Sequence, residues 1–529
     1  MGNYLNPDIS AFARVVNSEI YVDKTGLIEY TNRSAKTLQS YICISRPRRF
    51  GKSIAANMLS AYYTCEYDSR ELFSNLKIAS SDSYEKHLNK YDVIFLNMQE
   101  FLSQSSNVEE MLGLLKKSVI WDLLDKYPDF RYFDETNLMR TLQDIYNKTK
   151  RPFVVIIDEW DCIFREYITD KKAQEKYLDF LRDLLKDKGY VALAYMTGIL
   201  PIKKYGSHSA LNMFTEYSML DTGDLAEFFG FTEDEVKMLC AEYDMNYEET
   251  KRWYDGYGLV EHNRHGNIKY SIYSPKSLVE AMLKHRFGTY WNQTETYEAL
   301  KKYIQMDMNG LKNDIIKMLA GAKVRINTGT FSNDMTTFAT KDDILTLLVH
   351  LGYLTYDSEK ESVSIPNSEV SQEYINAIST MDWKNVIESV DESRNLLKSV
   401  WNMDAENVAK GIQKAHEEIS ILEYNDENSL SCTIGIAFYF AREYYNIIRE
   451  LPTGKEFADI CFIPQKAYLD KPAIIIELKW NKSAVGAIEQ IKANKYAGAL
   501  KEYKDNMLLV GINYDKKTKK HECIIEKYE

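Results

Sequence analysis

Apolar runs separated by amphipathic stretches fill the first 200 residues, and each run leads into polar side chains. Residues 41–45, 153–157 and 191–196 are almost wholly apolar. Short runs without alternation are typical of strands buried on both faces of a parallel sheet. A helical pattern at 54–63 follows the first run. The pattern therefore predicts an α/β protein whose N-terminal part is built on a parallel sheet.

The last third of the chain has a second pattern. Residues 425–450 are helical in pattern, with an apolar and aromatic body. A strand end at Glu450 then leads through a turn to a strand carrying Asp459, and the apolar run 473–476 predicts a third strand. A further helix is expected from Gly486 to about residue 502. The predicted order is helix, three strands, helix.

Between these regions the pattern is mainly helical. Residues 224–257 predict a helical lid, in which Thr232 and Glu235 form a capping box. Two helices, 342–350 and 372–378, flank a short hairpin within 351–366. This region is similar to the hairpin of a winged helix, which is either a DNA reader or a spacer. The apolar faces of its helices favour a spacer.

The first strand is followed by a candidate phosphate loop with the sequence RPRRFGKS, residues 46–53. Gly51 lets the backbone approach phosphates, Lys52 reaches the β and γ oxygens, and Ser53 offers a hydroxyl to Mg²⁺. The pattern departs from GxxxxGK(S/T) at its first glycine, where Arg46 stands. The predicted nucleotide-binding residues in this loop are Arg49, Phe50, Gly51, Lys52 and Ser53.

The second apolar run ends in two acids, Asp158 and Glu159, as a Walker B strand does. Asp158 would hold Mg²⁺ through water, and Glu159 would polarise the water that attacks the γ-phosphate. Thr197, at the end of the third run, is assigned by position alone to sense that phosphate. A buried strand followed by a helix start would give the same letters, but the two motifs together favour ATP binding with Mg²⁺.

The third C-terminal strand carries Glu477 and Lys479, which share a face because alternate residues of a strand do. Asp459 and Glu477 would hold a divalent ion, and Lys479 would orient or stabilise an attacking hydroxide. The alternative is an edge strand with a solvated glutamate and lysine. The surrounding order of elements favours metal-dependent phosphodiester cleavage.

This order of elements resembles the PD-(D/E)XK nuclease superfamily, over roughly residues 395 to 529. The resemblance implies that Asp459 and Glu477 are the metal-binding acids and Lys479 the catalytic lysine. It also assigns Gln490 as the polar residue of the following helix, Glu427 as an acid and metal ligand on the first helix, and Glu450 as a weaker additional ligand.

Five N-terminal stretches, 21–25, 45–53, 157–161, 231–236 and 253–257, together resemble the bacterial AAA-type ATPase-like family. Members of that family are often fused to a C-terminal PD-(D/E)XK domain. The resemblance implies an ATPase coupled to a nuclease and does not name the biological process.

The composition of the chain limits the classes of protein to which it can belong. Of the 529 residues 45% are hydrophobic and 27% charged, as in ordinary globular proteins. No apolar stretch approaches the ~18 to 20 residues that span a bilayer, so a cytoplasmic protein without membrane contact is expected. The 7 cysteines are scattered without a CxxC pair, which indicates reduced thiols and argues against structural zinc.

The net charge of -12 argues against binding nucleic acid with the whole surface, because affinity comes mainly from neutralised phosphates. Any DNA contact must be local. Residues 479–529 hold 11 lysines against 7 acidic residues. That excess permits a local DNA-binding patch, although a solvated helix face and turn would explain it equally well.

We therefore predict four regions: an AAA-type ATPase core (1–220), a helical lid (221–285), a helical or winged-helix-like linker (286–394) and a PD-(D/E)XK nuclease-like domain (395–529). The expected function is an ATP-regulated, Mg²⁺-dependent nuclease acting on DNA. One alternative is a nucleotide-switched interaction protein with a degenerate nuclease fold. Another is a plain ATPase motor, which requires the nuclease acids to lie apart. Assembly into a homo-oligomer is left open.

Overall fold

The computed structural model describes residues 2–528 apart from 203–210, 264–265, 292–295, 307, 309, 333–334, 336–337, 380, 382, 419–426, 453–456, 494–499 and 501–502. Contacts divide the chain into two compact units. The first is Met1–Thr294 with Arg325–Val370, and the second is Glu295–Val324 with Ser371–Glu529. The four predicted region boundaries stay a prediction.

A five-stranded parallel sheet organises the first unit, with strand order β2-β3-β4-β1-β5. All three predicted strands form, and β2 and β5 extend the sheet on either side. The bounds are β1 Tyr41–Ser45, β2 Asp92–Asn97, β3 Phe153–Asp158, β4 Val191–Gly198 and β5 Thr215–Tyr217.

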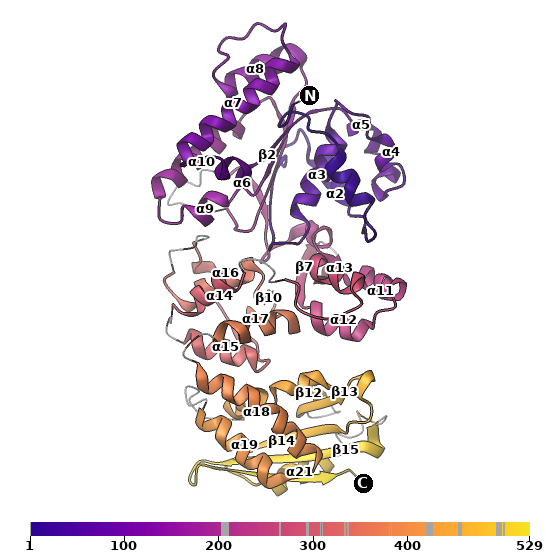
Figure 1. Ribbon diagram of the computed structural model, residues 1–529, viewed down its shortest axis with the longest axis vertical. Helices are drawn as coiled ribbons and strands as arrows, with labels where there is room; N and C mark the ends of the chain where they lie inside the picture. Colours follow the sequence, from indigo (N-terminus) through magenta and orange to yellow (C-terminus); the bar gives the residue numbers. More distant parts are fainter. Residues whose placement is uncertain are drawn as a thin grey trace. The chain divides into compact units, whose positions relative to one another are not determined.

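Helices cover both faces of this sheet, which is why its strands have no polar face. Figure 1 shows α2 and α3 on one side and α6, α7 and α10 on the other. The helices of this part are α1 Ser10–Val16, α2 Gly26–Ser34, α3 Lys52–Tyr63, α4 Arg70–Phe73, α5 Tyr84–His87, α6 Met98–Ser103, α7 Val108–Lys126, α8 Leu138–Thr149, α9 Cys162–Glu166 and α10 Lys171–Leu185.

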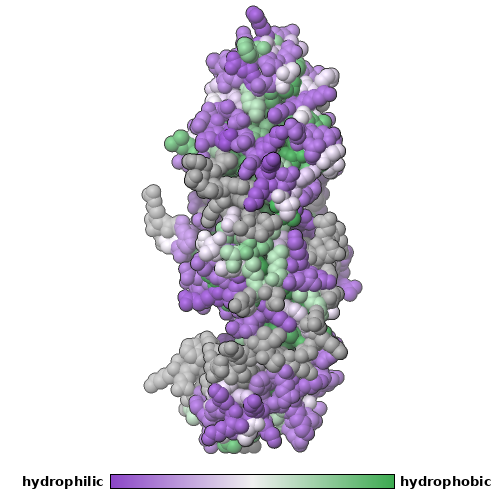
Figure 2. Space-filling view, turned by 90° about the vertical axis from the view of Figure 1, so that its left-hand side faces the viewer, coloured by the Kyte–Doolittle hydropathy of each residue, from purple (hydrophilic) through white to green (hydrophobic). Residues whose placement is uncertain are grey.

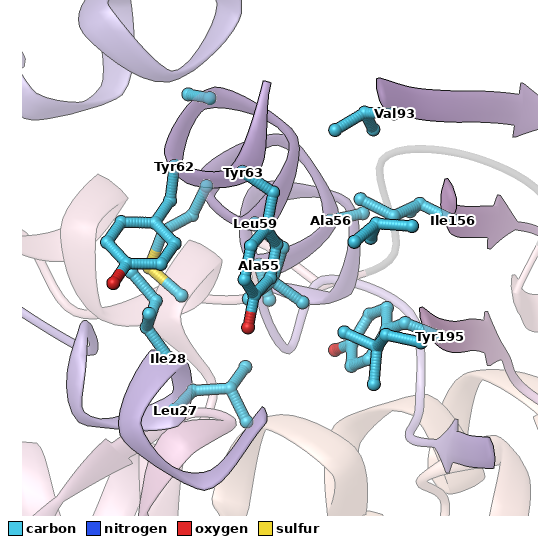
Figure 3. Close-up of a cluster of buried hydrophobic side chains, with 14 of the residues drawn as sticks. Leu27, Ile28, Ala55, Ala56, Leu59, Tyr62, Tyr63, Val93, Ile156 and Tyr195 are labelled. Atoms are coloured by element: carbon cyan, nitrogen blue, oxygen red, sulfur yellow. The ribbon is translucent and has the colours of Figure 1, made fainter. Parts of the chain in front are cut away.

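The α3 helix holds the core on its side of the sheet. Its buried residues include Ala56, Leu59 and Tyr63, which lie between α2 and the strand residues Ile156 and Tyr195 (Figure 3). Burial of such side chains contributes roughly 1.5–3 kcal/mol each. The helix that begins at the candidate phosphate loop is thus fixed along most of its length.

The predicted lid region is only partly helical. The capping box between Thr232 and Glu235 is present at the start of α11. The helices expected within 224–257 form as α11 and α12, and a three-stranded antiparallel sheet of order β6-β8-β7, which the sequence did not predict, lies beside them. The bounds are α11 Glu233–Glu242, α12 Tyr247–Tyr254, α13 Pro275–Leu283, β6 Phe231–Thr232, β7 Tyr257–Asn263 and β8 Gly266–Tyr273.

The short hairpin predicted within 351–366 forms, and β10 Thr355–Asp357 pairs antiparallel with β11 Ser362–Ser364. The two helices predicted around it are also present. The remaining elements of the middle region are α14 Thr296–Ile304, α15 Leu311–Leu319, β9 Val324–Arg325, α16 Lys341–Leu351 and α17 Ser368–Ser379.

The second unit is built on a mixed five-stranded sheet of order β12-β13-β14-β15-β16, in which only β14 and β15 run parallel. The predicted order of helix, three strands and helix is confirmed, and a β15–β16 hairpin completes the sheet. The bounds are α18 Lys384–Trp401, α19 Ala405–Glu418, α20 Glu427–Ala437, β12 Tyr445–Pro452, β13 Phe457–Pro464, β14 Ala473–Trp480, α21 Ala484–Ala493, β15 Met507–Asp515 and β16 Lys520–Lys527.

The predicted long helix 425–450 is wrong in its second half. The helix α20 ends at Ala437, a 3-10 turn spans Tyr439–Glu443, and Tyr445 begins β12. Tyr445, Ile447 and Ile448, which favour strands, gain backbone partners on β13, and this pairing outweighs the local helical pattern.

No helix among the described residues is long and apolar enough to cross a membrane. The face drawn in Figure 2 is largely hydrophilic.

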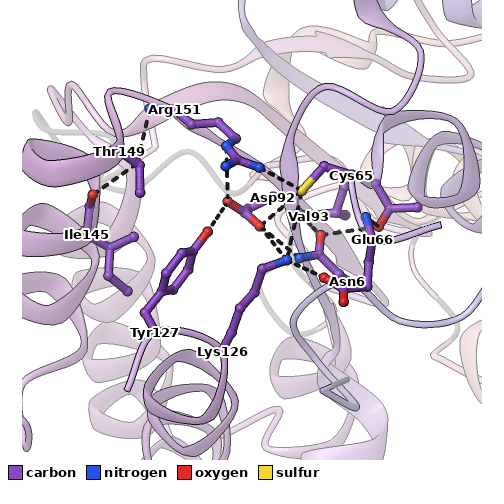
Figure 4. Close-up of polar contacts among 11 residues, drawn as sticks. Asn6, Cys65, Glu66, Asp92, Val93, Lys126, Tyr127, Ile145, Thr149 and Arg151 are labelled. Carbon is purple, nitrogen blue, oxygen red and sulfur yellow. Dashed lines mark hydrogen bonds and ion pairs between the residues drawn. The ribbon is translucent and has the colours of Figure 1, made fainter. Parts of the chain in front are cut away.

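A buried carboxylate, Asp92, anchors the amino end of β2 (Figure 4). It accepts hydrogen bonds from Asn6 and Tyr127, at 2.8 Å and 2.7 Å, and pairs with Lys126 at 3.1 Å. Burial by itself would raise the pKa of Asp92, but the Lys126 charge and these hydrogen bonds outweigh burial and lower it. The carboxylate therefore stabilises the folded chain in its ionised form.

We expect Asp92→Asn to lower the free energy of unfolding by about 2 kcal/mol near neutral pH, because the cations lose their buried partner. The pKa of Asp92 in the folded chain lies below the value of about 3.9 for an unfolded chain. The stabilisation by the ionised Asp92 is therefore fully present above about pH 3.9 and is lost as pH falls through the folded-state pKa. Denaturant unfolding of wild type and variant at several pH values measures it. Asp129→Asn, at an exposed site, is the control, and equal acid sensitivity of wild type and Asp92→Asn would contradict the assignment.

Candidate functional site

The first candidate site lies at the carboxyl edge of the parallel sheet. The register aligns Ile44 with Thr197 and Ile157 with Met196, so β4 is held between β1 and β3. Parallel strands end at the same edge, and the phosphate loop, Thr197 and Asp158 are therefore brought together there.

Lys52 begins α3 and is buried. Its Nζ donates hydrogen bonds to the carbonyl oxygens of Arg46 and Pro47 at 3.0 Å and 2.9 Å. The N-cap Gly51 has a φ of 87°, which only glycine adopts without strain. Burial lowers the pKa of Lys52, while the charges of Glu159 and Asp158 oppose that effect. An ammonium bonded to neutral carbonyls at a helix N-terminus suits a phosphate.

Arg46, at the position of the missing first glycine, does not face this site. Its guanidinium donates to the Tyr217 carbonyl oxygen at 2.8 Å and lies over the Phe229 ring. Burial lowers its pKa to about 10. The Arg46 side chain therefore stabilises the start of the loop by contacts with residues 217 and 229.

Two residues predicted to bind nucleotide point their side chains elsewhere. Arg49 donates to the Tyr290 carbonyl oxygen at 2.7 Å. Phe50 is fully buried, with its ring edge-to-face against Tyr257 at 5.1 Å and near Trp291. In this arrangement the backbone N–H groups of these two residues, and not their side chains, are the candidates for phosphate contact. Neither Tyr257 nor Trp291 was predicted from the sequence, although the aromatic motif at 253–257 was an available signal.

Asp158, the last residue of β3, and Glu159, which follows it, are close enough to the loop for their charges to act on Lys52. Thr197 Oγ1 donates to Asp158 Oδ1, and both side chains are buried. Glu159 has a φ of 53°, unusual for a residue with a side chain, and its carboxylate pairs with Arg165. Burial raises the pKa of Glu159, and the Arg165 charge opposes that rise. Ser53 is exposed at the start of α3.

The second candidate site lies in the mixed sheet. The pairing of Ile460 with Ile476, continued by one residue, sets Asp459 opposite Glu477. Lys479 Nζ pairs with Glu477 Oε1 at 2.8 Å, and both side chains are buried. Asp459 Oδ2 accepts the Leu478 backbone N–H at 2.7 Å. The three predicted catalytic residues are thus adjacent, and an edge strand with solvated side chains is excluded.

Burial raises the pKa of Glu477 to about 7; the hydrogen bond from Lys479 opposes this rise, and the Asp459 charge adds to it. Glu477 Oε2 is buried without a hydrogen-bond partner among the described residues. Two neighbouring carboxylates, one with an unsatisfied buried oxygen, fit a hard divalent cation. No group of three potential ligands of the His, Cys, Asp and Glu types is found in the part of the chain that the structure describes.

The remaining predicted residues of this site are placed by backbone. Glu450 on β12 is opposite Asp459 when the pairing of Arg449 with Ile460 is continued by one residue. The side chains of Glu427 and Glu450 lie outside the described residues. Gln490 is on α21, which packs on β14 and β15. Gly511 was not predicted from the sequence; it is aligned with Glu477, and a Cβ there would lie 2.4 Å from the Ala484 carbonyl oxygen.

Exposed lysines gather just beyond the end of β14. The Asn481 N–H donates to the Tyr514 carbonyl oxygen at 2.8 Å, and the Lys516 N–H donates to Asn481 Oδ1 at 2.8 Å. These bonds fasten the β15–β16 turn beside the strand that carries the candidate site. We call the exposed lysines of this region the lysine turn: Lys482, Lys516, Lys517, Lys519 and Lys520.

Comparison with known proteins identifies both domains. A family described as predicted AAA-ATPase matches residues 8–207. A family described as the PD-(D/E)XK nuclease superfamily matches residues 426–523. The first match contains the phosphate loop, Asp158 and Glu159, and the second contains Asp459, Glu477 and Lys479. No curated protein matches the chain.

Solved structures resemble the chain more distantly. A Walker-type ATPase of Pyrococcus abyssi is 13% identical over 66% of this chain and 94% of its own, with a TM-score of 0.35. The ORC2 protein of Aeropyrum pernix is 11% identical over 69% of this chain and 98% of its own, at 0.29. The CDC6P protein of Pyrobaculum aerophilum is 9% identical over 71% and 99%, at 0.24.

Proposed function

Since this chain joins an AAA-ATPase-like domain to a domain of the PD-(D/E)XK nuclease superfamily, we propose that it binds and hydrolyses ATP and cleaves DNA with Mg²⁺. The observation that carries the nuclease half is the alignment of Asp459 with Glu477, next to the buried pair of Glu477 and Lys479.

In the nuclease domain, Asp459 and Glu477 would hold Mg²⁺. The ion would supply a Lewis acid for the scissile phosphate and lower the pKa of the attacking water. Lys479 shares their face of β14 and would stabilise the hydroxide or the developing phosphate charge. The Leu478 N–H fixes Asp459, which limits the orientations of that carboxylate.

In the ATPase domain, Lys52 would exchange its two carbonyl partners for the β and γ phosphates. Ser53 and Asp158 would hold Mg²⁺, and Thr197 would contact the γ-phosphate from β4. Glu159 would orient the attacking water. The ATP-dependent step would regulate cleavage, since both activities belong to one chain.

The lysine turn is the local basic patch through which an acidic protein could bind DNA. Its side chains are exposed, and the turn lies next to the end of β14. Its first residue, Lys482, is three residues beyond Lys479 in the sequence. Phosphate neutralisation by such a patch would supply affinity without sequence readout.

The register of β13 and β14 argues against a plain ATPase motor, because that function required Asp459 and Glu477 to lie apart. A nucleotide-switched interaction protein differs from the proposal only in catalysis, and a cleavage assay separates the two.

We expect Lys52→Ala to weaken ATP binding by about a hundredfold or more, because the lost ammonium makes charge-assisted bonds to phosphate. Isothermal titration with ATP and Mg²⁺ measures the affinity. Lys148→Ala, at an exposed helix site, is the control. Unchanged affinity in folded Lys52→Ala protein would remove the ATPase half of the proposal.

We expect Asp459→Asn, Glu477→Gln and Lys479→Ala each to lower Mg²⁺-dependent DNA cleavage by about a hundredfold or more, and the losses should not add because the residues act as a unit. ATP binding should persist. Cleavage of single- and double-stranded DNA is assayed with Mg²⁺ or Mn²⁺, with and without ATP. Asp505→Asn, exposed before β15, is the control. If the wild-type protein cleaves neither DNA nor RNA, that result would favour the alternative of a nucleotide-switched interaction protein.

Replacing Lys516, Lys517, Lys519 and Lys520 by alanine should weaken DNA binding and flatten its salt dependence, by about 0.9 in log–log slope for each phosphate that is no longer neutralised. Fluorescence anisotropy at several salt concentrations measures both. Lys410→Ala with Lys414→Ala on α19 is the control. An unchanged slope would show that DNA is bound elsewhere.

A further inference from the structure

The geometry around Glu159 points to Arg165 as a positioning residue: we propose that it holds the Glu159 carboxylate in the orientation from which this group directs the water that attacks ATP. This inference rests on the proposed ATPase function. It concerns a residue outside the phosphate loop and outside the two acids of the strand motif.

Arg165 joins two acids. Its Nη2 pairs with Glu159 Oε2, and its Nε lies 3.3 Å from Asp161 Oδ2. The arginine side chain is 11% exposed and that of Asp161 is fully buried, whereas Glu159 is 24% exposed. Asp161 is thus the buried end of this series of three side chains. Glu159 is the more exposed end and lies at the carboxyl edge of the parallel sheet, where the candidate phosphate loop is.

Asp161 is held by the two residues that follow β4, the strand that carries Thr197. Asp161 Oδ2 accepts the backbone N–H groups of Ile199 and Leu200 at 3.1 Å and 2.8 Å. A Cβ at Gly198 would lie 2.8 Å from Asp161 Oδ1, so glycine allows this close approach. The backbone after β4 therefore fixes the position of the Asp161 carboxylate. Asp161 in turn orients the Arg165 guanidinium, which orients the Glu159 carboxylate.

An arginine suits this task because its extended, planar cation can donate a hydrogen bond to Glu159 through Nη2 while its Nε stays in an ion pair with Asp161. Burial would lower the pKa of Arg165, but the charges of Asp161 and Glu159 outweigh burial and raise it. A catalytic base is commonly oriented by a third group that does not touch the substrate. The Glu159 side chain is 24% exposed, so the ion pair with Arg165 restricts a carboxylate that packing alone leaves partly open.

The test is a double-mutant cycle on ATP hydrolysis in the full chain, with Arg165→Gln, Glu159→Gln and the two combined. Arg165→Gln should lower kcat by about tenfold to a hundredfold, which is at most the low end of the ~10²- to 10⁴-fold that acid–base assistance contributes, because Glu159 itself is kept. KM and the Kd of ADP should stay within about twofold. In the Glu159→Gln background, Arg165→Gln should cause no further loss. Arg165→Lys, which keeps the charge, should recover part of kcat.

Arg182→Gln is the matched control, since Arg182 on α10 pairs with Asp179 at 2.9 Å on an exposed surface. It should keep the wild-type kcat. Should Arg165→Gln fail to fold, Arg165→Lys carries the test: a lower kcat with unchanged ADP affinity supports the inference, and a wild-type kcat overturns it.

An unchanged or higher kcat in Arg165→Gln overturns the inference, as do losses that multiply in the double variant or a parallel fall in ADP affinity. A wild-type chain that turns over no ATP refutes the proposed ATPase function, and this inference with it. Wild-type turnover combined with multiplicative losses refutes Arg165 alone.

Discussion

Hydrogen-bond register between neighbouring strands is the constraint on which both candidate sites depend. In the parallel sheet, β4 lies between β1 and β3, so residues separated by more than a hundred positions end at one edge. In the mixed sheet, the antiparallel register of Ile460 with Ile476, continued by one residue, sets Asp459 opposite Glu477. A slip of one residue would turn these two carboxylates to opposite faces of the sheet. Packing of apolar side chains on both faces prevents that slip.

Several of the buried charged groups among the described residues have a partner of opposite charge. Removing a single charge from water is costly, whereas paired and hydrogen-bonded charges are tolerated. Asp92 has Lys126, Asp161 has Arg165, and Glu477 has Lys479. Buried Lys52 and Arg46 instead bond to neutral carbonyls, and one Glu477 oxygen has no hydrogen-bond partner among the described residues.

Local pattern predicted the strands of the first sheet and the helix–strand order of the second unit, because long apolar runs and turn residues are local signals. It failed where distant partners decide the conformation. Residues 445–450 have a helical pattern, yet they pair with β13. The lid contains a sheet because β6, β7 and β8 pair with one another. Phe50 looked like part of the phosphate contact, but Tyr257 and Trp291 bury its side chain.

The sequence alone determined the chemistry available at each site: a glycine, lysine and serine at a helix start, two acids after an apolar strand, and the Glu477–Lys479 pair. These signals are short-range, since each depends on spacing within one element. The tertiary structure decided which groups meet. Asp161 was fixed by the backbone after β4, and Asp459 was brought opposite Glu477 by the pairing of β13 with β14. These contacts depend on strand order and burial, which no local spacing encodes. Arg165 lies only four and six residues from Asp161 and Glu159, but burial decided that it pairs with both.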